Sequence, residues 1–205
     1  MKIDHLFLLL IASLFIFSCS DSNKRHYTLA SDATILSFGD SLTFGTGASK
    51  GEDYPSLLAS LTNLQVFNAG IPGEISSKGL ERLPALLDQH KPDLLILIHG
   101  GNDILRKLPR LELKNNLIAM LSEAESRNIP VVALGIPEPG LFLKSADVYQ
   151  QLASETNVPF ELSLLPEIIG DTSLKSDIAH PNAEGYQEMA EGIFEFLEDQ
   201  GFIEN

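Results

Sequence analysis

Short runs of mostly apolar residues alternate along this chain with longer segments whose apolar positions recur every three or four residues. The short runs predict buried parallel strands, because a strand covered on both faces carries few polar side chains. They occupy residues 33–38, 64–68, 93–98, 131–135 and 158–161. The longer segments predict amphipathic helices, at residues 54–61, 76–89, 112–127, 146–156 and 181–200.

This alternation of strands and helices predicts an α/β domain around a mainly parallel, five-stranded sheet with right-handed crossovers. Residues 33–205 show no internal repeat and no composition change that would mark a second domain. With 205 residues, of which 44% are hydrophobic and 20% charged, the chain is long enough for one globular domain with a full core.

The N-terminal segment does not belong to this pattern. Residues 6–17 are almost wholly apolar, too few for a transmembrane helix but matching the core of a signal peptide. Ser18-Cys19 follows and resembles the lipobox of bacterial lipoproteins, although Phe17 is bulky for it. We therefore expect residues 1–18 to be a lipoprotein signal peptide, and residues 19–32 to be a lipidated Cys19 followed by a polar tether. A secretory signal without lipidation and an uncleaved anchor are the alternatives.

This interpretation predicts a protein of the cell envelope, attached to a membrane through Cys19. Ser20 follows the cysteine, which by analogy with Gram-negative lipoproteins favours the outer membrane. Cys19 is the only cysteine, so no disulfide can form within the chain. A formal net charge of −14 without a basic stripe disfavours nucleic acid as a partner.

The strand predicted at residues 33–38 leads into Gly39-Asp40-Ser41, a turn that opens a helix. Parallel sheets place their crevices at the carboxyl ends of the strands, so the Ser41 hydroxyl is expected at such a crevice. The Ser41 backbone N–H has no partner within the helix and can donate to an oxyanion. The alternative is that Ser41 only caps the helix.

Asp177-Ile178-Ala179-His180 supplies a candidate base for Ser41. Histidine titrates near neutral pH and can take a proton from a serine hydroxyl, provided that one ring nitrogen is oriented. Asp177 can accept that orienting hydrogen bond. Asp-x-x-His alone is a weak signal, since His180 could be an ordinary surface residue of a turn.

Candidate oxyanion donors lie in two further turns. Gly73 offers a backbone N–H without a side chain in the way, and Asn102 offers its side-chain amide. His99 precedes this second turn, either as another titrating group near the site or as a neutral, hydrogen-bonded histidine. No metal-ligand spacing stands out, and we expect no metal and no cofactor.

Together these segments resemble the ordered motifs of the SGNH/GDSL hydrolases: Gly39-Asp40-Ser41-Leu42, Gly73, Gly100-Gly101-Asn102-Asp103 and Asp177-x-x-His180. The resemblance covers nearly all of the chain from residue 33 onward. It is greatest to bacterial periplasmic enzymes with thioesterase, lysophospholipase and arylesterase activity.

The resemblance implies a flavodoxin-like, three-layer α/β/α sandwich and hydrolysis of acyl esters through an acyl-serine. It implies Ser41 as the nucleophile, His180 as the base and Asp177 as its orienter. The implied oxyanion donors are Ser41, Gly73 and Asn102.

The substrate is less defined than the chemistry. Four apolar residues could line a groove for an acyl chain or could simply anchor loops: Leu105, Leu108, Leu141 and Phe142. A membrane-tethered enzyme with such a groove would meet lysophospholipids or other acyl esters. A carbohydrate O-acetyl esterase and a non-catalytic lipid-binding lipoprotein are the alternatives, and a monomer is expected.

Overall fold

The computed structural model describes residues 27–140 and 143–204. The strands there are β1 (Thr34–Gly39), β2 (Gln65–Gly70), β3 (Leu94–Ile98), β4 (Val131–Leu134) and β5 (Phe160–Glu161). All neighbouring strands pair in parallel, in the order β2-β1-β3-β4-β5. This order is that of flavodoxin-like sheets, and it reverses direction next to β1.

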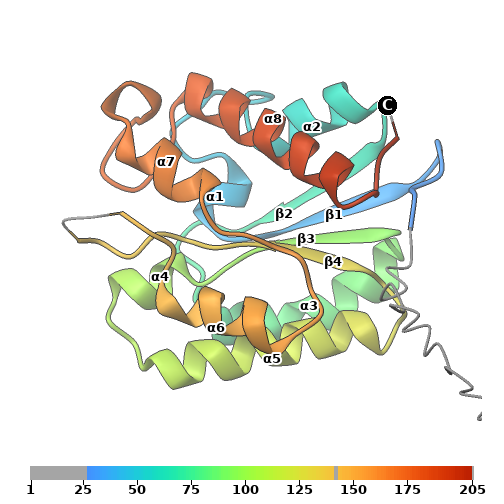
Figure 1. Cartoon of the computed structure of the whole chain (residues 1–205), viewed down its shortest axis with the longest axis horizontal. Coiled ribbons are helices and arrows are strands. Elements are labelled where there is room, and N and C mark those ends of the chain that lie inside the picture. The colour runs from blue at the N-terminus through green and yellow to red at the C-terminus, as the bar shows by residue number, and fades with distance from the viewer. Residues whose placement is uncertain (1–26, 141–142, 205) are drawn as a thin grey trace, which may run out of the picture.

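Helices precede and follow most strands of this sheet. They are α1 (Ser41–Phe44), α2 (Tyr54–Thr62), α3 (Ser76–His90), α4 (Gly101–Leu105), α5 (Arg110–Glu125), α6 (Asp147–Glu155), α7 (Leu164–Gly170), η1 (Thr172–Leu174) and α8 (Ala183–Asp199). Figure 1 shows α2, α7 and α8 over one face of the sheet and α3, α5 and α6 over the other. The predicted three-layer α/β/α sandwich is therefore confirmed.

The core forms between the sheet and its two helical layers. All five residues of β3 are buried, as the continuous apolar run of a central strand predicts. The inward faces of α5 and α8 close the two sides of the sheet with Leu113, Leu117, Ile193 and Leu197. This packing makes the sheet a rigid base for the loops at its edges.

Two short helices differ from the sequence prediction. The glycines at 100 and 101 predict a turn, but the chain forms α4 there, and five residues are too few to show helical periodicity. The apolar residues of α7 do not predict a helix either, because Pro166 interrupts their pattern. Both elements lie near the carboxyl ends of the strands, where the candidate residues gather.

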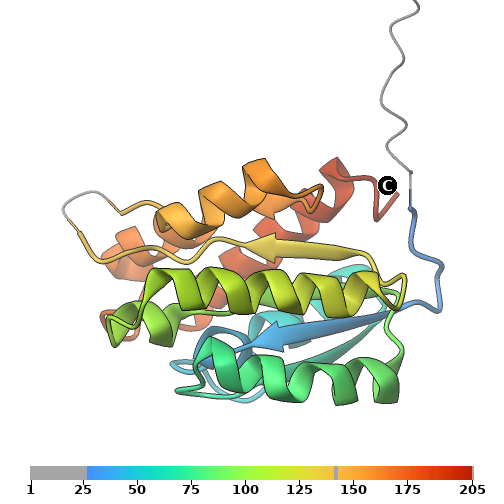
Figure 2. The same cartoon turned by 90° about the horizontal axis from the view of Figure 1, so that it is seen from below.

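The two ends of the described chain lie near the amino-terminal ends of the strands, opposite to the carboxyl ends where the candidate residues gather. The Leu29 N–H donates to the Phe202 carbonyl at 2.8 Å, and the Tyr27 and Phe202 rings lie 6.4 Å apart. Figures 1 and 2 show this end of the sheet far from α1 and α4. Cys19, the proposed signal peptide, Leu141 and Phe142 lie outside the described residues. Among the helices of the described part, none is long and apolar enough to cross a membrane.

Candidate active site

The turn between β1 and α1 places Ser41 at the first position of a helix. A Cβ at Gly39 would lie 2.1 Å from the Ile98 carbonyl oxygen, so only glycine allows β1 and β3 to come this close. The next residue, Asp40, accepts a hydrogen bond from the Leu42 N–H at 3.2 Å and caps α1. The cap fixes the direction in which the chain leaves the strand, and therefore the position of Ser41.

Ser41, His180 and Asp177 form one chain of hydrogen bonds. His180 Nε2 lies 2.9 Å from Ser41 Oγ. His180 Nδ1 lies 2.8 Å from Asp177 Oδ2 and 3.0 Å from Oδ1. Because an ionised carboxylate only accepts hydrogen bonds, the contact with Asp177 favours the tautomer with the proton on Nδ1. Nε2 then has a free lone pair that can accept the Ser41 proton. The structure therefore brings the three residues together in the geometry of a nucleophile, a base and an orienting carboxylate.

The loop that carries His180 is itself fixed by hydrogen bonds. Asp177 Oδ1 accepts from the Ala179 N–H at 2.8 Å and from the His180 N–H at 2.9 Å. Burial opposes ionisation of Asp177, but the bonds from Ala179 and His180 outweigh it and lower the pKa of this carboxyl. Asp177 thus stays charged and can stabilise a protonated His180.

Asn102 joins this group from the first turn of α4, which follows β3. Its Nδ2 donates to Asp40 Oδ2 at 3.4 Å, a long contact that nevertheless directs the amide toward the Ser41 turn. Asp40 is buried, and burial raises the pKa of its carboxyl although His99 and His180 lie close enough to oppose the change. From the sequence, Asp40 belongs only to the turn before Ser41, and no sequence signal indicates its contact with Asn102.

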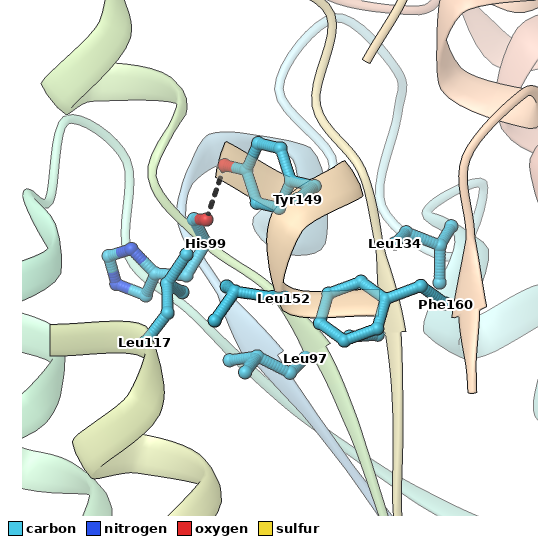
Figure 3. Close-up of a pocket in the computed structure, with 8 residues that line it drawn as sticks. Leu97, His99, Leu117, Leu134, Tyr149, Leu152 and Phe160 are labelled. Atoms are coloured by element: carbon cyan, nitrogen blue, oxygen red, sulfur yellow. Dashed lines mark hydrogen bonds between the residues drawn. The ribbon is translucent and has the colours of Figure 1, made fainter. Parts of the chain in front are cut away.

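A hydrogen bond from the Tyr149 side chain, on α6, holds the backbone before Asn102 in place. The Tyr149 hydroxyl donates to the His99 carbonyl at 2.8 Å, as Figure 3 shows. Gly100 has a left-handed φ of 112°, and a Cβ there would lie 2.7 Å from that hydroxyl. These contacts fix the start of α4, on which Asn102 stands.

The cavity in Figure 3 is not a substrate site. It lies beside Leu97, Leu152 and Phe160 in the core, and its volume of about 10 Å³ is that of roughly one water molecule. The His99 side chain is buried at its edge, with Nε2 3.1 Å from Glu74 Oε2. The structure therefore favours the interpretation of His99 as a hydrogen-bonded histidine that does not line the cleft around Ser41 described below.

Gly73 lies on the loop between β2 and α3. This loop leaves β2 beside the Ser41 turn, where the Ile71 N–H donates to the Gly39 carbonyl at 3.2 Å. Gly73 has a φ of 77°, which favours glycine, and its carbonyl accepts from Arg106 Nη2 at 2.8 Å. It is exposed and is not among the residues that line the cleft described below.

Comparison with known proteins identifies this arrangement. Residues 37–188 match the model of the GDSL-like lipase/acylhydrolase family. The chain belongs to this family. It is 31% identical over 198 residues to an arylesterase of Vibrio mimicus, covering 91% of this chain and 96% of the relative. It is also 31% identical over 184 residues to the thioesterase 1/protease 1/lysophospholipase L1 of Escherichia coli K12, covering 84% and 86%.

The fold agrees with this assignment. The crystal structure of the psychrotrophic esterase EstA from Pseudoalteromonas sp., inhibited by monoethylphosphonate, superposes with a TM-score of 0.71 at 28% identity. The match covers 82% of this chain and 100% of that one. The protein is therefore a serine ester hydrolase of the GDSL family that acts on acyl esters.

A cleft of about 290 Å³ opens over Ser41 and His180 in this GDSL hydrolase. Its volume is close to the lower end of the range of small-molecule sites. Most of its other lining residues are apolar: Leu42, Ile104, Leu105, Ile136, Pro137, Pro139, Leu143, Ile169, Ile178 and Ala179. The cleft is suited to an apolar group attached to a carbonyl.

The cleft distinguishes among the four residues that the sequence leaves open as the lining of an acyl groove or as anchors of loops. Leu105 lines it and is half exposed. Leu108 does not line it, because the chain turns away after α4: Lys107 has a φ of 55° and the Leu108 N–H donates to the Asp103 carbonyl at 2.9 Å. Leu141 and Phe142 lie outside the described residues, between the lining residues Pro139 and Leu143.

Proposed function

We propose that Ser41 is the nucleophile of the GDSL hydrolase and that His180 is its general base. The observation that carries this assignment is the 2.9 Å distance from His180 Nε2 to Ser41 Oγ, with Asp177 on the opposite ring nitrogen. Ser41 Oγ loses its proton to His180 and bonds to the acyl carbon, whose carbonyl oxygen becomes an oxyanion. His180 then gives the proton to the leaving alcohol or thiol as the carbon–oxygen or carbon–sulfur bond breaks.

Water completes the cycle on the acyl-serine. His180 takes a proton from water, the resulting hydroxide bonds to the acyl carbon, and the acid leaves as the proton returns to Ser41. Three donors are proposed for the oxyanion of both steps: the Ser41 N–H, the Gly73 N–H and Asn102 Nδ2. Support comes from their positions in the three segments that follow the carboxyl ends of β1, β2 and β3, which pair side by side.

The proposed substrates are esters or thioesters of medium or long acyl chains, with lysophospholipids among them. The apolar lining of the cleft supports this class, because each buried methylene of the chain contributes about 0.8 kcal/mol. The names of the relatives, an arylesterase and a thioesterase/lysophospholipase, point the same way. A carbohydrate acetyl ester would instead need a shallow polar pocket.

The rate of hydrolysis of p-nitrophenyl esters from acetyl to palmitoyl tests this substrate class. We expect kcat/KM to rise from acetyl to a medium or long chain. A maximum at acetyl would contradict the proposal and favour a carbohydrate O-acetyl esterase.

We also propose that Cys19 is lipidated and that the GDSL hydrolase acts, as a monomer, in the cell envelope at the outer membrane. The resemblance of residues 16–19 to a lipobox supports the lipidation and membrane attachment, and Ser20 after the cysteine supports the outer membrane. Membrane fractionation of the wild type beside Cys19→Ser tests it. An unchanged membrane fraction in Cys19→Ser would contradict lipidation.

A further inference from the structure

The loop that carries Gly73 has little to hold it in place by itself. It lies at the surface, and Ile71, Pro72 and Gly73 are all exposed. Gly73 adds a backbone of wide conformational freedom at a φ of 77°. Yet a donor to an oxyanion must be fixed before the reaction, and a displacement of about 1 Å can cost about 10²-fold in rate.

We propose that Arg106 and Arg82 are positioning residues that hold the Gly73 loop, so that the Gly73 N–H and the Asn102 amide meet at one oxyanion. This proposal rests on the proposed function, in which both groups are oxyanion donors. Neither arginine touches the substrate in this account.

Arg106 connects the two donors through α4. Its Nη2 donates to the Gly73 carbonyl at 2.8 Å, and its own N–H donates to the Asn102 carbonyl at 3.0 Å. The short helix α4 therefore carries the Asn102 amide in its first turn, and Arg106 at its C-terminal end binds the Gly73 carbonyl. Arg106 forms no ion pair with any residue that the structure describes, so its guanidinium is used on this carbonyl.

Arg82, on α3, anchors the same loop by binding the side chain of Glu74. Its Nε lies 2.8 Å from Glu74 Oε1 and its Nη2 lies 2.7 Å from Oε2, which is the paired geometry of a guanidinium and a carboxylate. Glu74 directly follows Gly73, so this pair restrains the donor residue. The Glu74 side chain is almost fully buried and also lies 3.1 Å from His99 Nε2.

The same guanidinium joins this loop to the nucleophile turn. Arg82 Nη2 donates to the Ala69 carbonyl at 2.8 Å and to the Gly39 carbonyl at 3.1 Å, at the ends of β2 and β1. Its central carbon lies 4.1 Å from the centre of the Phe38 ring, which adds a cation–π contact. Arg82 therefore bonds within two residues of Ser41 on one side and beside Gly73 on the other.

Arg127 offers a matched comparison for Arg82. It also binds carboxylates, with Nε 2.7 Å from Asp88 Oδ1 and Nη1 2.7 Å from Glu123 Oε2, and its side chain is similarly exposed, 25% against 21%. It lies beyond the end of α5 and is not a lining residue of the cleft. A role limited to stability would make the two arginines equivalent, whereas a positioning role makes only Arg82 matter for catalysis.

Arg106→Met beside Lys107→Met tests the first anchor. Both residues are exposed at neighbouring positions, and the Lys107 side chain makes no hydrogen bond within residues 27–140 and 143–204. For a p-nitrophenyl ester, we expect kcat to fall about tenfold in Arg106→Met with KM within twofold of the wild type. Lys107→Met should keep both constants within twofold.

Arg82→Lys beside Arg127→Lys tests the second anchor, because lysine keeps the charge but loses the paired geometry. We expect kcat to fall about tenfold in Arg82→Lys alone. Labelling of the nucleophile by a serine-directed phosphonate should slow in parallel, because the tetrahedral adduct uses the same donors. The midpoint of thermal unfolding reports any loss of stability separately.

The proposal is overturned if Arg106→Met retains kcat within twofold, whatever Arg82→Lys does. It is also overturned if each arginine variant loses no more kcat than its control. These results are distinct from a failure of the proposed function, which would appear as full activity in Ser41→Ala. If Arg82→Lys does not fold, the Arg106→Met and Lys107→Met pair alone decides the question.

Discussion

His180 Nε2 lies 2.9 Å from Ser41 Oγ, although 139 positions separate the two residues in the sequence. The contact depends on two rigid supports. Ser41 follows β1, inside the sheet, and His180 precedes α8, whose start is capped by Asn182 with its Oδ1 2.9 Å from the Gly185 N–H. Proton transfer between them therefore needs no large movement of the fold.

Replacing Asp177 by asparagine should separate the orientation of His180 from the fold of its loop. The oxygen of the introduced amide could still accept from the backbone, but the amide would no longer favour a proton on His180 Nδ1. We expect kcat to fall about 10²-fold or more, measured on a p-nitrophenyl ester. Asp171→Asn is the control, because Asp171 also accepts from an N–H two residues on, Ser173 N at 2.8 Å, but lines no part of the cleft. Equal losses in the two variants would contradict the assigned role.

The contact between Asp40 and Asn102 predicts that Asp40→Asn impairs catalysis. An amide in place of the Asp40 carboxylate would direct an N–H group at Asn102 Nδ2, which itself donates. We expect kcat to fall about tenfold with little change in KM. The control is Asp93→Asn, since Asp93 accepts from the Thr34 N–H at 2.8 Å at the far end of β1. An unchanged kcat in Asp40→Asn would show that Asn102 is oriented without it.

Asp40 and Glu74 predict opposite effects of pH on stability. Burial raises the pKa of Asp40, so ionisation of this carboxyl costs more in the folded state than in the unfolded chain. The folded state therefore loses stability as pH rises from about 4, the usual Asp value, toward the raised pKa. For Glu74, burial also favours the neutral acid, but hydrogen bonds from His99 and Arg82 outweigh it and lower the pKa.

The contribution of Glu74 is therefore present above about pH 4.3, the usual Glu value, and is lost as pH falls through the lowered pKa. The free energy of unfolding in urea, measured from pH 3 to 7, reports the contributions of both Asp40 and Glu74. The stability of the wild type relative to Glu74→Gln should increase with pH, by on the order of 1 kcal/mol. Its stability relative to Asp40→Asn should decrease over the same interval. Two parallel trends would contradict the assigned environments.

Leu105 should affect the use of long acyl chains more than that of short ones. It lines the cleft with 51% of its surface exposed, so Leu105→Ser removes apolar contact without opening the core. We expect kcat/KM for an octanoyl ester to fall about fivefold, corresponding to about 1 kcal/mol of apolar burial, with acetyl hydrolysis within twofold. Leu111→Ser is the control, since Leu111 is exposed on α5 outside the cleft. Equal losses on both esters would place Leu105 outside the acyl path.

The sheet and the position of Ser41 could be predicted because their signals are local, whereas Asp177-x-x-His180 is a weak signal alone and is assigned through its order relative to the other motifs. An apolar run that ends in Gly39-Asp40-Ser41 defines a strand, a turn and a helix start, and parallel topology then brings the strand ends to one edge. The sequence could also place Gly73 in a turn and Asn102 directly after a strand at that edge, since glycine is typical of turns, but it gives no signal for the helix α4 that carries Asn102.

The contacts that fix those turns could not be predicted. Arg82 and Glu74 are eight residues apart with no periodic relation, and their pairing depends on how α3 packs against the end of β1. The sequence leaves Leu108 open as an acyl-groove residue or a loop anchor, but a left-handed residue at Lys107 turns it away from the cleft, and a lysine gives no sequence signal for that conformation. The missing information is thus tertiary: which side chain reaches which loop.

The most direct test of the account is the site at which a serine-directed phosphonate attaches. Wild-type protein is treated with the phosphonate, and its mass and labelled peptide are measured beside those of Ser41→Ala. We expect one adduct, on Ser41, none in Ser41→Ala, and a loss of ester hydrolysis of at least about 10³-fold in that variant. An adduct on another residue, or full hydrolysis by Ser41→Ala, would contradict Ser41 as the nucleophile.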